Sequence, residues 1–125
     1  MMIIQYRNYF KERNLKIMEK KKVMLSQPMG GLSEGEILSK KKKATEFLKN
    51  KGYEVIDTFF DDKEFNNIMD KENVTNRPMF YLAKSIEAMS ACDSVYFCKG
   101  WESARGCEIE HLVAEKYGLE IMEEV

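Results

Sequence analysis

The chain has 125 residues, of which 44% are hydrophobic and 33% are charged. This length and composition predict a single compact domain that buries enough apolar surface to fold without a disulfide or a metal ion. Its 20 basic and 21 acidic side chains leave a formal net charge of −1, so no general positive field is available to attract nucleic-acid polymers.

Apolar runs in the sequence are short, as in Met79 to Leu82, and fall far below the ~20 residues that span a bilayer. The first twenty or so residues mix charged and aromatic side chains, which does not fit a secretory signal. No pair of cysteines has a C-x-x-C spacing, so we expect buried thiols at Cys92, Cys98 and Cys107. These features predict a cytoplasmic protein that binds no membrane.

The first predicted element is a buried parallel strand over Val23–Ser26, which follows three lysines. Residues Met29 to Leu32 predict a glycine turn after it. Ser33, followed three residues later by Glu36, predicts a capping box that opens a helix. Gly52 predicts the end of that helix.

The middle of the chain predicts a second strand over Tyr53–Asp57 and then a long polar loop from Thr58 to Arg77. Pro78 is expected near the start of the next helix. A helical apolar face is formed by Phe80, Leu82, Ala83, Ile86 and Met89.

The last third of the chain predicts a third strand over Ser94–Cys98, whose residues are mostly apolar, aromatic or β-branched. A loop over residues 99–103 leads into a helix from Ala104 to Tyr117, which Gly118 ends. Residues Leu119 to Met122 predict the final strand.

Short apolar strands alternating with helices indicate an α/β fold. We expect a small doubly wound, Rossmann-like parallel sheet of about four to five strands, with helices on both faces. Residues 1–21 are interpreted as a polar N-terminal extension, and residues 22–125 as the folded domain.

Ligands of open parallel sheets bind outside the carboxyl ends of the strands. The loops after the first and third strands both meet this condition, and each leads into a helix N-terminus, which favours an anionic group. Gly30 and Gly31 also fit a tight turn with no ligand, and Trp101 fits either stacking on a base or packing within its loop. The candidate binding residues are Ser26, Gln27, Met29, Gly30, Gly31, Trp101, Glu102, Ser103, Arg105 and Gly106.

Glu110 is the candidate catalytic residue. It lies one helical turn after Gly106 and one before Ala114, on a face of small residues that can approach the glycine turn. A desolvated carboxylate aimed at a crevice suits nucleophilic attack on the anomeric carbon of a sugar. The plainer alternative is a solvated glutamate that complements the helix dipole.

The segment from Gly100 to His111 resembles the signature loop and helix of the DUF4406 family, which is similar to nucleoside 2-deoxyribosyltransferases and deoxynucleoside 5′-monophosphate N-hydrolases. Residues Leu25 to Gly31 and Cys92 to Phe97 resemble other parts of that family, in the same order. The resemblance implies that Glu110 attacks C1′ of a deoxyribose and releases the base. The chain departs from the transferases at the position of one aspartate, where it has Ala104, and Glu102 is the candidate substitute for that aspartate.

The partner implied by this resemblance is a small-molecule nucleoside or nucleotide, with no cofactor and no metal ion. Self-association as a dimer or larger homo-oligomer is expected through the helices near residues 79–91 and 104–117. Two other functions stay open from the sequence: a nucleotide-binding module, and an oligomeric accessory protein with a vestigial site.

Overall fold

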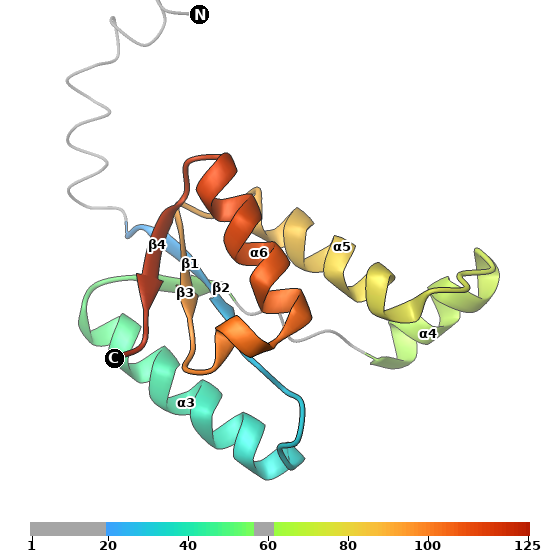
Figure 1. Ribbon diagram of the computed structural model, residues 1–125, viewed down its shortest axis with the longest axis horizontal. Coiled ribbons are helices and arrows are strands. Elements are labelled where there is room, and N and C mark those ends of the chain that lie inside the picture. Colours follow the sequence, from blue (N-terminus) through green and yellow to red (C-terminus); the bar gives the residue numbers. More distant parts are fainter. Residues whose placement is uncertain (1–19, 57–61) are drawn as a thin grey trace, which may run out of the picture.

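A computed structural model of the chain describes residues 20–56 and 62–125, so nearly all of the predicted extension lies outside the described residues. The described elements alternate between strands and helices along the chain (Figure 1). In order they are β1 (Lys22–Ser26), α3 (Glu34–Asn50), β2 (Glu54–Ile56), α4 (Asp62–Lys71), α5 (Arg77–Met89), β3 (Ser94–Phe97), the 3-10 turn η1 (Trp101–Ser103), α6 (Arg105–Lys116) and β4 (Glu120–Glu123).

The described strands form one four-stranded parallel sheet in the order β2-β1-β3-β4. The chain moves from β1 outward to β2 and then returns to the opposite side of β1 to form β3. The direction of winding therefore reverses between β1 and β3, and the carboxyl ends of these two strands border a crevice suited to a ligand. The predicted α/β fold with a parallel sheet is confirmed.

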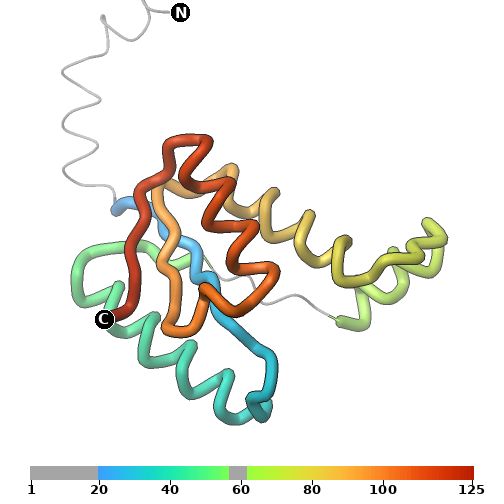
Figure 2. Tube along the Cα trace, in the orientation of Figure 1, coloured from blue at the N-terminus to red at the C-terminus, as the bar shows by residue number. Residues whose placement is uncertain are grey.

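Helices cover both faces of the sheet, as Figures 1 and 2 show. Side chains alternate between the faces along β1, so Val23 packs in a cluster with Leu48 of α3. Met24 packs on the other face with Met89 of α5 and Ala114 of α6. Because both faces are buried, the central strands are almost wholly apolar, which is why the sequence indicated them clearly.

The start of α3 contains the predicted capping box. The Glu36 N–H donates to the Ser33 hydroxyl at 3.1 Å, and the Ser33 N–H donates to the Glu36 carboxylate at 3.2 Å. These two bonds satisfy N–H groups that have no partner inside the helix. Gly52 follows the helix with a φ of +92°, a left-handed conformation that glycine adopts without a steric penalty.

The prediction of a loop from residue 58 to residue 77 is wrong over Asp62–Lys71, where α4 forms, whereas residues 72–76 are the non-helical connection to α5. The apolar residues of α4 contact α5 instead of the sheet: the Phe65 ring lies 5.4 Å from the Phe80 ring, and Met69 is buried. Figure 1 shows α4 beside the N-terminal end of α5, away from the sheet. A helix with one neighbour needs only a short apolar stripe, and its polar composition otherwise resembles that of a loop.

The described helices are not membrane-spanning segments, although some of them expose large apolar side chains. None of these helices has the length and apolar content needed to cross a membrane. Large apolar side chains are nevertheless exposed on α5 at Met79 and on α6 at Ile109 and Leu112. The self-association expected through these two helices stays a prediction.

Candidate functional site

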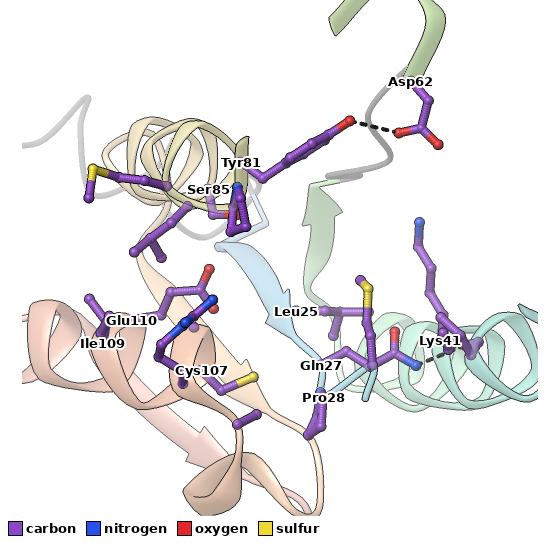
Figure 3. Close-up of a pocket in the computed structure, with 18 of the residues that line it drawn as sticks. Leu25, Gln27, Pro28, Lys41, Asp62, Tyr81, Ser85, Cys107, Ile109 and Glu110 are labelled. Atoms are coloured by element: carbon purple, nitrogen blue, oxygen red, sulfur yellow. Dashed lines mark hydrogen bonds between the residues drawn. The ribbon is translucent and has the colours of Figure 1, made fainter. Parts of the chain in front are cut away.

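A pocket of about 990 Å³ lies beside the carboxyl end of β1, between α3, α5 and α6 (Figure 3). Its wall is largely apolar, with a few charged and polar groups. Such a composition is typical of small-molecule sites. The lining residues are Leu25, Gln27, Pro28, Met29, Glu34, Ile37, Leu38, Lys41, Asp62, Asn76, Pro78, Met79, Tyr81, Leu82, Ser85, Ala104, Arg105, Gly106, Cys107, Ile109 and Glu110.

Glu110 lies in the pocket wall and is only 8% exposed. It occupies the inward face of α6 together with Cys107 and Ala114, at three- and four-residue spacing. Ser26, at the end of β1, points to the same side of the sheet, and its hydroxyl donates to Glu110 Oε1 at 2.6 Å. The last residue of the first strand thus orients the carboxylate of the last helix.

The environment of Glu110 affects its ionisation in two opposing ways. Burial raises the pKa of the Glu110 carboxyl above its usual value, because desolvation disfavours the charged form. Hydrogen bonding from the Ser26 and Ser85 hydroxyls lowers the pKa, because it stabilises the carboxylate. The net effect is a raised pKa, so the two hydroxyls only partly offset the cost of burial.

Cys107 lines the pocket one turn before Glu110. Burial raises the pKa of its thiol, while a hydrogen bond with Ser26 lowers it. Burial likewise raises the pKa of Cys98 to about 12. Both thiols therefore stay protonated near neutral pH and are poor nucleophiles. All three cysteines are free and buried, as predicted.

The loop after β1 is braced against α3. The Gln27 side chain donates from Nε2 to the Ile37 carbonyl at 2.8 Å, and Gln27 and Met29 both line the pocket. Gly30 and Gly31 do not line it. Gly31 has a φ of +77°, and a side chain added at either glycine would meet no atom within 4 Å. The two glycines therefore make a turn with no close backbone approach.

Trp101 packs within the protein and does not line the pocket. Its ring stacks on His111 with centroids 4.0 Å apart and an interplanar angle of 3°. Its indole Nε1 donates to Glu123 Oε1 at 3.0 Å, which ties η1 to β4. Phe97 completes the cluster, 5.5 Å from Trp101 and 4.8 Å from His111. Of the two interpretations open from the sequence, this geometry favours packing.

The remaining candidates from the third loop divide into two groups. Arg105 and Gly106, in the first turn of α6, line the pocket. Glu102 and Ser103 are exposed residues of η1 and do not line it. Of these four candidates, only the two in the N-terminal turn of α6 contribute to the pocket wall.

Sequence reasoning did not identify three polar residues that line the pocket from α4 and α5. Ser85 lies near Glu110, and the Tyr81 hydroxyl donates to Asp62 Oδ1 at 3.1 Å. One signal was available: Tyr81 and Ser85 are four residues apart on the stripe that also carries Leu82 and Met89, so they interrupt an otherwise apolar face. Asp62 gave no such signal because its helix was not predicted.

Comparison with known proteins places the chain in a family without assigning it an activity. Neither the curated proteins nor the solved structures gave a significant match. The family described as "Domain of unknown function (DUF4406)" matches residues 21–123, which include every strand and helix named above. By this match over most of its length, the chain belongs to the DUF4406 family.

Proposed function

We propose that this domain cleaves or transfers the N-glycosidic bond of a deoxynucleoside or a deoxynucleoside 5′-monophosphate, with Glu110 as the nucleophile. The observation that carries the proposal is the 2.6 Å hydrogen bond from Ser26 to a Glu110 carboxylate that is buried in the wall of a large, mostly apolar pocket. A nucleophile needs a fixed orientation and partial desolvation, and this arrangement supplies both.

The proposed reaction has two steps. A Glu110 oxygen forms a bond to C1′ as the C1′–N bond breaks, and the bonding electrons leave with the base, which takes a proton from solvent. Water or an acceptor base then attacks C1′, transfers its proton to solvent and releases the Glu110 carboxylate. Retaining glycoside hydrolysis follows the same logic of a carboxylate nucleophile and a covalent glycosyl-enzyme.

Base release tests this proposal directly. Deoxynucleosides and their 5′-monophosphates are incubated with the protein, with and without an acceptor base, and the products are separated by chromatography. We expect release by the wild type and none by Glu110→Ala. Glu108→Gln is the control because Glu108 is exposed on the same helix. Absence of release from every substrate by the wild type contradicts the proposal.

A second candidate function is nucleotide binding without catalysis. It is favoured by the hydrogen bond from Ser26 to the buried Glu110 carboxylate, because a carboxylate held in this way can also accept a hydrogen bond from a sugar hydroxyl without forming a bond to C1′. Measurable nucleoside binding by a wild type that releases no base distinguishes this candidate from the first.

The pH dependence of base release should reveal the role of Ser26. The rate is expected to fall on the acid side as Glu110 becomes protonated, with a midpoint above the usual carboxyl value because burial raises the pKa. Ser26→Ala removes a hydrogen bond that lowers this pKa, so the acid limb should move to higher pH. The exposed Ser103→Ala is the control. An unchanged acid limb in Ser26→Ala contradicts the assignment.

A further inference from the structure

The pocket has a second polar wall, which the proposed reaction does not use. Figure 3 shows Glu110 on the α6 side and the hydrogen-bonded pair of Tyr81 and Asp62 on the side toward α4. All three residues line the same pocket, so one ligand can contact both walls. The two polar groups therefore define opposite ends of a binding site.

Apolar side chains line other parts of the same pocket. Leu82 lines the pocket from the same helix as Tyr81, and Pro28 and Ile37 line it from the β1–α3 segment. Apolar surfaces of this kind favour a flat ring, whose faces avoid water while its edges need hydrogen bonds. If the reacting sugar occupies the Glu110 end, the attached ring is directed toward the Tyr81–Asp62 pair.

The hydrogen-bonding character of the pair is that of an acceptor. Tyr81 donates its single hydroxyl proton to Asp62 Oδ1, so this hydroxyl has no second proton to donate to a ligand. A carboxylate has only acceptors, in about four positions, and the bond from Tyr81 occupies one of them. A ligand group that contacts this pair must therefore supply hydrogen atoms.

We propose that Asp62, oriented by Tyr81, selects bases that carry an exocyclic amino group, such as adenine or cytosine, over their oxo counterparts. This inference rests on the proposed function for the identity of the ligand. An amino group donates to the carboxylate in a charge-assisted bond. A carbonyl oxygen at the same position faces the carboxylate with no proton between them, which is repulsive.

Matched nucleoside pairs test the inference by binding alone. Deoxyadenosine and deoxyinosine differ by an amino or oxo group at one ring position and by the proton that the oxo member carries on the adjacent ring nitrogen, and deoxycytidine and deoxyuridine differ in the same way. Affinities are measured by calorimetry with the full chain carrying Glu110→Gln, so that no substrate is consumed. We expect the amino member of each pair to bind about tenfold or more tightly, the effect of one hydrogen bond to a charged group.

Substitutions then assign the preference to the pair. Adding Asp62→Asn should reduce the affinity ratio to about one, because an amide turns either its oxygen or its NH₂ group toward the ligand. Tyr81→Phe should reduce the ratio only partly, because the carboxylate remains. Glu72→Gln is the control: it also turns a carboxylate into an amide, at an exposed residue that follows α4 and does not line the pocket, and it should keep the full ratio.

The outcomes separate this inference from the proposed function. A ratio near one in the parent protein, a ratio that Asp62→Asn leaves unchanged, or no binding of any of the four nucleosides overturns the inference. Base release by the wild type together with any of these results leaves the proposed function standing without it. An Asp62-dependent ratio in a protein that releases no base supports the inference and removes the catalytic proposal.

Discussion

Glu110→Gln is expected to reduce base release by at least about a thousandfold while making the folded protein more stable near neutral pH. The catalytic loss follows from the proposed mechanism, because an amide does not form the glycosyl ester. The gain in stability follows from burial, because the neutral amide does not carry the desolvation cost of the carboxylate at this position, which is 8% exposed. Opposite changes in activity and stability are characteristic of a functional residue that is costly to bury.

The dependence of this stability gain on pH can be derived from the raised pKa. The folded state holds the Glu110 proton more tightly than the unfolded chain, whose carboxyl has a pKa near the ordinary value of 4.5. Between these two values the unfolded chain has already lost its proton, so the free energy of unfolding falls as pH rises through the folded-state pKa. The advantage of Glu110→Gln should therefore be small below pH 4.5 and largest at neutral pH.

Urea unfolding of both proteins at about pH 4 and about pH 7 measures this difference. Glu108→Gln serves as the control because Glu108 is an exposed residue on the same helix, and its stability should match that of the wild type at both pH values. A Glu110→Gln protein that is less stable than the wild type at neutral pH would mean that the hydrogen bond from Ser26 outweighs the desolvation of the carboxylate.

The parts of the site that the sequence predicted are those that repeat with the period of a helix or a strand. Ser26 was placed at the end of a strand by the apolar run before it, and Glu110 was placed on a small-residue face by Gly106 and Ala114. In the structure these two residues are 84 positions apart in sequence and share a hydrogen bond. A parallel sheet brings them together, because the carboxyl ends of adjacent strands and the helices that follow lie at one edge.

The parts that the sequence did not predict depend on a single tertiary neighbour. The apolar stripe of α4 packs against α5. Its few apolar residues form too weak a pattern to predict a helix from the sequence, and Asp62 was missed because it lies in that helix. Trp101 was equally suited to a base and to a side chain, since either offers a flat surface. The sequence did not indicate that Trp101 stacks on His111, because this contact depends on how α6 packs against η1. Such pairwise contacts have no period that a sequence can display.

Phe97→Ala is expected to destabilise the protein by about 3–5 kcal/mol, the usual cost of removing a large aromatic side chain from a core. Phe97 is fully buried, and its ring lies against both members of the Trp101–His111 stack. The substitution therefore creates a cavity where β3, η1 and α6 meet. Domains commonly have a stability of only about 5–15 kcal/mol, so a large share is lost at one position.

The single tryptophan makes this effect measurable both locally and globally. Urea unfolding gives the total loss, and the emission of Trp101 in the folded state should shift to longer wavelength as water reaches the indole. Phe47→Ala is the matched control, because Phe47 is 46% exposed and packs on Tyr96 on the opposite face of the sheet; it should cost about 1 kcal/mol and leave the emission unchanged. Equal losses at the two positions would mean that the η1–α6 junction is not anchored through Phe97. The position of Glu110 on α6 would then depend on other contacts, which include its hydrogen bonds with Ser26 and Ser85.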